Sequence, residues 1–178
     1  TLLFGLNTAV AAVAGVFHIM NHATFKASLF MAAGIVDHET GTRDIRRLRG
    51  LLRAMPITGA LALVASAAMA GVPLLNGFLS KEMFFAEAVF IESRPWVEIA
   101  LPVLATVAGA FAVVYSLRFG YDIFFGRPAA DLPRQPEEPP LWMRIPVDVL
   151  VLLCLVVGIA PAISVGPLLA AAARPVVG

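Results

Sequence analysis

The chain has 178 residues, of which 60% are hydrophobic and 14% are charged, and its mean hydropathy is +0.87. Soluble proteins average about 45–50% apolar and about 25% charged residues, so the composition excludes a soluble enzyme and indicates an integral membrane protein. The net charge of +1 gives no indication of nucleic-acid binding, and the single cysteine excludes a disulfide framework and a cysteine-rich metal site.

The first half of the chain predicts two membrane spans. A bilayer core of about 30 Å needs about 20 apolar helical residues, and residues 8–36 satisfy this before a polar loop at 37–55. The second span, 56–92, contains the stretch "GVPLLNG", in which Pro73 lacks an N–H group and Gly71 is a helix breaker. We therefore expect this span to be one discontinuous helix.

The second half predicts two further spans. Helices are expected at 95–125 and 144–160, joined by a proline-rich, extended loop at 126–143. The tail, 161–178, is apolar enough to begin another span that the sequence truncates. The fold class is thus all-α, with about four transmembrane helices, and the chain is expected to be an internal fragment of a larger protein with a single membrane domain, 1–178.

Arginines predict how these spans are oriented. They gather in the loops at 37–55 and 126–143, whereas the loop before the third span has only Arg94. By the positive-inside rule, the two arginine-rich loops face the cytoplasm. The stretch "RDIRRLRGLLRAM" is either a short basic amphipathic helix on that surface or a solvated loop, and the loop interpretation is favoured.

Three ionisable residues lie at intervals of four in the first span: His18, His22 and Lys26. This spacing puts them on one face of a helix. A lysine at the centre of a bilayer costs about 2.5–3.5 kcal/mol on the insertion scale. One interpretation is that the histidines are packed, hydrogen-bonded residues and that Lys26 neutralises a fixed acid. Three groups in register favour a proton or ion pathway.

Two more charged residues, Lys81 and Glu82, follow the break in the second span. Adjacent helical residues point about 100° apart, so the two cannot face one partner. A broken helix is tolerated at membrane depth only inside protein or against a water-filled cavity, and broken helices recur in transporters. The alternative is a proline kink from which Lys81 reaches a nearby surface.

The sequence lacks the phosphate-binding, dinucleotide-binding, haem and iron–sulfur motifs. His18 and His22 have the spacing of half a zinc site, but the residues between them lack the glutamate of a metalloprotease. We therefore expect no cofactor, no metal and no enzymatic activity.

Two windows, "HIMNHATFKASLFMAAGIVDHETGTRDIRRLRGL" and "MPITGALALVASAAMAGVPLLNGFLSKE", resemble the large antiporter-like subunits. This superfamily includes the proton-pumping subunits of respiratory complex I and the A-type subunit of the multisubunit Mrp-type (Mnh or Pha) Na⁺/H⁺ antiporters, to which the first window is most similar. The resemblance is specific over residues 15–90. It implies two inverted five-helix repeats, each with a broken helix, and it assigns this chain to the second repeat and beyond.

The resemblance also implies roles for single residues. Lys26 matches the central proton-carrying lysine of a half-channel, and His18 and His22 match the histidines beside it. Lys81 matches the lysine of the second broken helix, and Glu82 its acidic neighbour. A multi-pass protein of the bacterial cytoplasmic membrane is implied, with the other membrane subunits of a hetero-oligomeric antiporter complex as partners.

The expected function is exchange of Na⁺ or K⁺ for protons across the lipid bilayer, with protons moving along a buried relay of lysines, histidines and water. The first alternative is a proton-pumping subunit of an NADH–quinone oxidoreductase, which flavin and iron–sulfur partner subunits would indicate. The second is a scaffold without transport, in which the substitution Lys26→Met would impair assembly rather than exchange.

Overall fold

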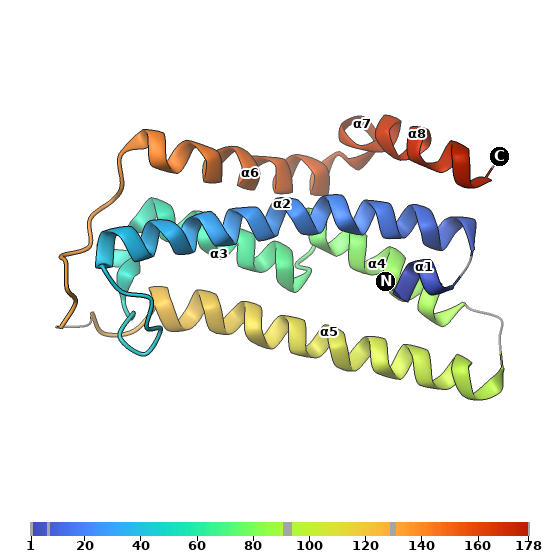
Figure 1. Ribbon diagram of the computed structural model, residues 1–178, viewed down its shortest axis with the longest axis horizontal. Helices are drawn as coiled ribbons and strands as arrows, with labels where there is room; N and C mark the ends of the chain where they lie inside the picture. Colours follow the sequence, from blue (N-terminus) through green and yellow to red (C-terminus); the bar gives the residue numbers. More distant parts are fainter. Residues whose placement is uncertain (1, 7, 91–93, 129–130, 178) are drawn as a thin grey trace.

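The computed structural model describes residues 2–6, 8–90, 94–128 and 131–177, and within these ranges every regular element is helical. Three long helices run along an elongated bundle (Figure 1): α2 (Ala9–Thr40), α5 (Pro95–Phe124) and α6 (Leu141–Ile159). Two shorter helices follow one another between them, α3 (Pro56–Ala70) and α4 (Asn76–Val89). The remaining elements are short: α1 (Leu2–Gly5), the 3₁₀ helix η1 (Leu51–Arg53), α7 (Pro161–Ser164) and α8 (Gly166–Val177).

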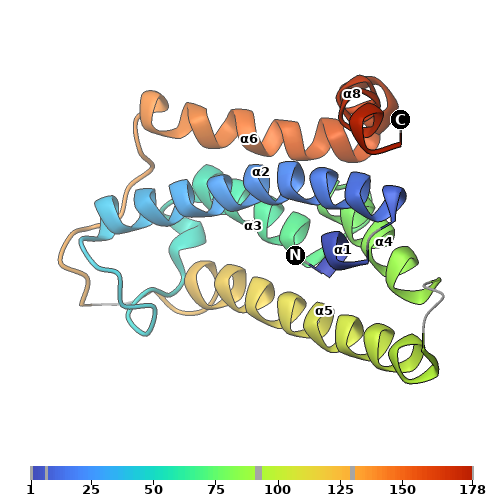
Figure 2. The same cartoon turned by 45° about the vertical axis from the view of Figure 1, so that its right-hand side comes forward.

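Helix α2 is the centre of the bundle, since it packs against α3, α4, α6 and α8. Helix α5 packs on α3 and α4 from the other side, as the turned view shows (Figure 2). The connections after α2 and after α5 gather at one end of the bundle, and α1 and α8 lie at the other (Figure 1). The apolar core lies mainly among α2, α3 and α6, with Phe25, Met55 and Val151 among its buried members.

Helices α5 and α6 are long and apolar enough to cross a membrane, judged by length and composition. Helix α3 is apolar but has 15 residues, and α4 has 14. Neither reaches the length of about 20 residues that a bilayer requires, but the two in series do. The discontinuous second helix that the sequence predicts therefore corresponds to α3 and α4.

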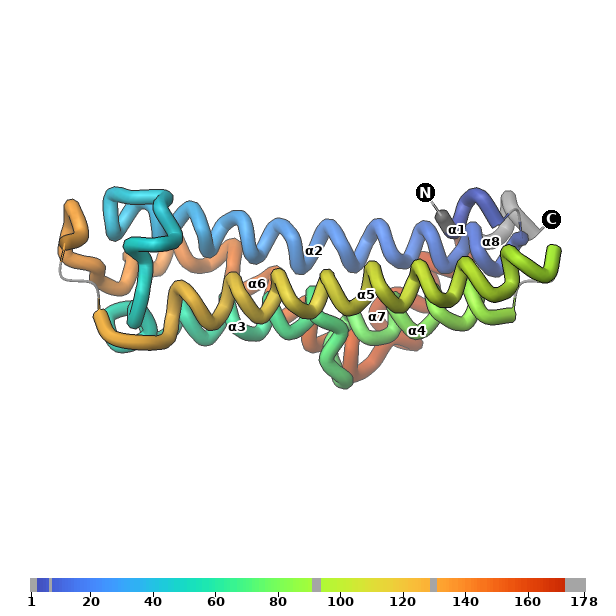
Figure 3. The backbone as a smooth tube through the Cα atoms, turned by 90° about the horizontal axis from the view of Figure 1, so that it is seen from below, coloured from blue at the N-terminus to red at the C-terminus, as the bar shows by residue number. Residues whose placement is uncertain are grey.

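The chain between α3 and α4 projects from the middle of the bundle (Figure 3). Gly71 ends α3 in the left-handed conformation, at φ +87°, and its N–H donates to the carbonyls of Ala67 and Ala68. This glycine cap satisfies backbone groups that the end of a helix leaves free. Helix α6 passes close to the break, because a Cβ on Gly158 would lie 2.3 Å from the Leu74 carbonyl oxygen.

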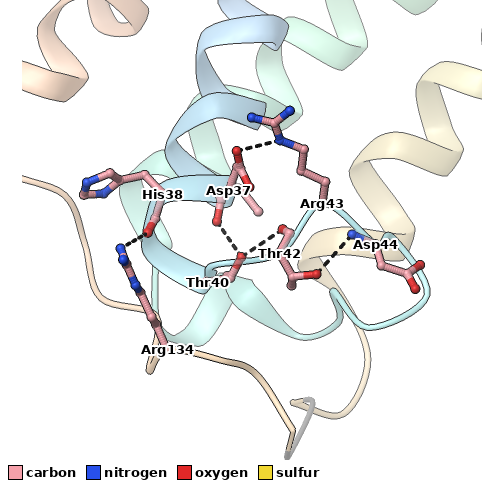
Figure 4. Close-up of polar contacts among 8 residues, drawn as sticks. Asp37, His38, Thr40, Thr42, Arg43, Asp44 and Arg134 are labelled. Atoms are coloured by element: carbon pink, nitrogen blue, oxygen red, sulfur yellow. Dashed lines mark hydrogen bonds and ion pairs between the residues drawn. The ribbon is translucent and has the colours of Figure 1, made fainter.

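The structure extends the first predicted helix by four residues. The sequence predicts an end at Val36, whereas α2 continues to Thr40 and is capped by Gly41 at φ +71°. The polar run "DHET" contains no helix breaker, so the helix can end at the first glycine. A hydrogen bond also stabilises the additional turn of α2, because Arg134 of the proline-rich loop donates to the carbonyl of His38 at 3.1 Å (Figure 4).

Ion pairs between neighbouring residues stabilise the loop after α2. Arg43 Nε lies 2.7 Å from a carboxylate oxygen of Asp37 (Figure 4). Arg46 hydrogen-bonds the Asp44 carboxylate and thereby holds the pKa of Asp44 below its ordinary value. The segment forms a turn and η1 rather than a continuous amphipathic helix, which agrees with the loop interpretation.

Other boundaries differ slightly from the predicted ones. Helix α5 ends at Phe124, next to the predicted end, and α6 begins at Leu141 rather than at 144 because Pro140 supplies an extended residue directly before it. The tail, for which the sequence predicts a truncated span, forms α7 and α8. Glu138 of the proline-rich loop caps the start of α3 by accepting hydrogen bonds from the N–H groups of Ile57 and Thr58.

Candidate functional site

Helix α2 presents His18, His22 and Lys26 at successive turns, as their spacing predicts. The rings of His18 and His22 have centroids 5.9 Å apart and are tilted by 38°. The Lys26 ammonium lies 5.3 Å from the centroid of the Tyr115 ring on α5. A cation over an aromatic face is attracted by the ring quadrupole. The Tyr115 ring can therefore stabilise the charge of Lys26 without an acidic residue.

The histidine nearer the start of α2 is joined to α4. Nδ1 of His18 and Oγ of Ser80 lie 2.6 Å apart, within hydrogen-bonding distance. Ser80 is 1% exposed, so the bond links two helices inside the bundle. It holds the orientation of the imidazole and leaves the other ring nitrogen available to a second partner.

Lys81 turns back toward the break. Its ammonium donates a hydrogen bond to the carbonyl of Ala70 at 2.7 Å, at the carboxyl end of α3. The carboxyl end of a helix carries partial negative charge and attracts cations. The path of the side chain runs over Gly71, where an added Cβ would lie 2.8 Å from Lys81 Cδ.

A cavity of about 360 Å³ brings these groups together between α2, α4 and α5. His18, His22 and Lys81 line it, together with Tyr115, the residue that contacts Lys26. The remaining lining is mostly apolar and includes Phe25, Met69, Phe84 and Phe85. A cavity of this size with several polar groups can hold several water molecules, which could bridge the ionisable side chains.

Glu82 lies elsewhere. It lines a separate pocket with Phe17, Met83 and Val165, between α4 and the last two helices. The angle of about 100° between adjacent helical residues accounts for this, because Lys81 faces the break and α5. The structure therefore brings together the two histidines and Lys81, places Lys26 against Tyr115 beside them, and leaves Glu82 apart.

Two residues of this site are absent from the sequence prediction. Tyr115 belongs to an apolar helix and gives no signal in the sequence, because its contact with Lys26 depends on how α5 packs. Ser80 gives a weak signal, since it precedes Lys81 directly and lies four residues after Asn76, on the same helical face. Among the described residues, no group of three His, Cys, Asp or Glu side chains could hold a metal ion.

Comparison with known proteins gives a consistent result. The family described as "NADH:quinone oxidoreductase/Mrp antiporter, TM" matches residues 1–109. The chain is 69% identical over 169 residues to a probable K⁺/H⁺ antiporter subunit of the A/B type from Rhizobium meliloti, covering 95% of this chain and 17% of the relative. It is 45% identical over 151 residues to the A-type subunit of a Na⁺/H⁺ antiporter from Bacillus subtilis, covering 81% and 19%. The chain thus spans about a fifth of the length of these curated relatives.

Solved structures share the fold. A chain of the Mrp complex from Dietzia sp. DQ12-45-1b is 38% identical and superposes with a TM-score of 0.82, covering 98% of this chain and 18% of that one. A chain of respiratory complex I from Thermus thermophilus is 27% identical, with a TM-score of 0.76, covering 97% and 35%. Both complexes contain a helical arrangement like the one seen here.

Proposed function

Because the chain belongs to the NADH:quinone oxidoreductase/Mrp antiporter transmembrane family, we propose that it is part of a membrane subunit that exchanges K⁺ or Na⁺ for protons. The observation that carries this proposal is the cavity shared by His18, His22 and Lys81 between membrane helices. The similarity to relatives named as K⁺/H⁺ and Na⁺/H⁺ antiporter subunits supports exchange over redox-driven pumping.

In this proposal, Lys26 and Lys81 take up and release protons. His18 and His22 relay them with water in the cavity, since imidazole both donates and accepts protons near neutral pH. Lys81 in its charged form stays on the Ala70 carbonyl, and loss of its proton would remove the attraction to that helix end. Glu82 would act separately, at the α4 surface that faces α7 and α8.

The surroundings of the protein belong to the same proposal. We assign it to the bacterial cytoplasmic membrane, in a complex with other membrane subunits, as in the Mrp complex that it resembles. The bundle end that holds the arginine-rich loops would face the cytoplasm. The exposed apolar side chains of α5, among them Phe111 and Leu117, would face lipid or neighbouring helices.

Everted membrane vesicles that contain the full-length protein together with its partners test the function. A pH gradient is established, KCl or NaCl is added, and a fluorescent pH probe reports how fast the cation dissipates the gradient. Wild type is expected to respond to at least one of the two cations. Lys26→Met and Lys81→Met keep the side-chain volume and remove the charge, and both are expected to abolish the response while assembly stays normal.

Arg127→Met is the matched control, because it removes a cation from an exposed loop residue outside the cavity. Its response should equal that of wild type. If neither cation acts and NADH alone builds a gradient, the protein belongs to a redox-driven pump. If the lysine variants fail to assemble, the charges of Lys26 and Lys81 serve the structure of the complex, as a scaffold would require.

A further inference from the structure

A pair of asparagines joins α2 to the first turn of α4, one helical turn away from the His18–Ser80 bond. Asn76 Nδ2 lies 3.2 Å from Asn21 Oδ1 and 3.5 Å from the Asn21 carbonyl oxygen. The side chains are almost completely inaccessible, with 2% of Asn21 and none of Asn76 exposed. Neither residue lines the cavity that holds the histidines and Lys81.

The pair leaves two polar atoms unsatisfied. Within the part of the chain that the structure describes, Asn21 Nδ2 and Asn76 Oδ1 are buried without a hydrogen-bond partner. Asn76 also contacts the thiol of Cys154, which is a weak hydrogen-bonding group. Unsatisfied polar groups are strongly unfavourable at membrane depth, so a partner for both atoms is expected.

The chemistry of the two atoms identifies that partner. One atom is a donor and the other is an acceptor. If both amides are turned over, Asn76 supplies the free donor and Asn21 the free acceptor, so the pair still needs one of each. Turning the Asn21 amide alone would set two NH₂ groups 3.2 Å apart, where they repel each other, and turning the Asn76 amide alone would set two oxygens there, an arrangement that only a cation between them could stabilise. A cation, however, would leave both NH₂ groups without an acceptor.

We propose that Asn21 and Asn76 bind a buried water molecule that donates to Asn76 Oδ1 and accepts from Asn21 Nδ2. Water is the small ligand that satisfies a donor and an acceptor together, and buried waters typically serve such groups. The water ties the start of α4 to α2 directly after the helix break. At this point beside the break, the two amides thus hold water rather than a cation.

A high-resolution cryo-electron microscopy map of the complete complex in lipid nanodiscs tests the site directly. One sample contains KCl, one contains TlCl at a low, soluble concentration, and one contains choline as the monovalent cation. The expected result is one density of equal height in all three maps, within hydrogen-bonding distance of both amides. A density that appears or strengthens with K⁺ or Tl⁺, or no density in a map that resolves neighbouring waters, would overturn the proposal.

Variants give an independent measurement. Asn21→Leu and Asn76→Leu keep the branching of the native side chain and remove its polar atoms, and each alone leaves the partner amide buried and unsatisfied. Each should lower the melting temperature of the purified complex, whereas the double variant should lower it less than the sum of the two. Additive shifts would contradict a shared ligand. Neither measurement depends on transport, so the water site stands or falls separately from the exchange function.

Discussion

The position of the Lys81 side chain depends on Gly71. The glycine lies at φ +87°, where an alanine costs about 1–2 kcal/mol, and its missing side chain leaves the space that the lysine stem occupies. A methyl group there would force the stem to shift, which would disturb the hydrogen bond between the ammonium and the Ala70 carbonyl.

We expect Gly71→Ala to lower both the stability of the proposed complex and the rate of the proposed cation–proton exchange. Thermal unfolding and the vesicle assay measure these two effects. Gly34→Ala is the matched control, because an added Cβ at that helical position meets nothing within 4 Å. Normal exchange by a correctly assembled Gly71→Ala variant would show that the lysine does not need this position.

The contact between Tyr115 and Lys26 leads to a second prediction. Its ring lies beneath the Lys26 ammonium, and a cation–π contact at an exposed site is worth about 0.5–1 kcal/mol. Tyr115→Leu should therefore slow exchange by about two- to fivefold, whereas Tyr115→Phe keeps a ring and should stay close to wild type. Initial rates in vesicles measure both. Equal rates in the two variants would remove Tyr115 from the site.

The start of helix α3 is capped by a residue from the loop before α6. The Glu138 carboxylate accepts hydrogen bonds from the N–H of Ile57 at 3.1 Å, and from the N–H and hydroxyl of Thr58 at 2.8 and 2.6 Å. These groups are among the donors that a helix start leaves free, and the negative charge is favourable there. The contact therefore fastens the proline-rich loop to the bundle.

Glu138→Gln is expected to destabilise the protein by about 1–3 kcal/mol, because the amide keeps one acceptor oxygen but loses the negative charge and the second acceptor. The neighbouring Glu137 is exposed, so Glu137→Gln serves as the control and should have little effect. The measurement is the melting temperature of the purified complex. Equal melting temperatures for the two variants would mean that the cap contributes nothing to stability.

Local signals in the sequence predict some elements well and others less well. Gly71 and Pro73 predict the break of the second span, because glycine and proline act on their own backbone. The end of α2 at Thr40 has a local signal in Gly41, but the hydrogen bonds that Arg134, distant in the chain, makes to the last turn are not predictable in this way. The spacing of the ladder on α2 follows from helical geometry, whereas its partners Ser80 and Tyr115 follow from packing.

The whole molecule has two distinct ends, and the arginines predict which one faces the cytoplasm. Arg47 belongs to the loop after α2 and Arg127 to the loop after α5, which gather at one end of the bundle (Figure 1), and Arg94 directly precedes α5. Single cysteines at these three positions can be tested in intact cells with a maleimide that does not cross membranes, in a Cys154→Ala background. Label is expected at position 94 only, and at positions 47 and 127 after the cells are opened. The reverse pattern would invert the topology.

The break between α3 and α4 has one more consequence, which concerns voltage. Helices of 15 and 14 residues extend about 22 and 21 Å, so the ammonium beside the break lies roughly halfway between their outer ends. A proton that reaches Lys81 from one membrane surface would cross about half of the transmembrane potential, which amounts to about 1.2 kcal/mol at 100 mV. The proton occupancy of this lysine would then change about sevenfold per 100 mV, so its protonation would depend on voltage even without a difference in pH.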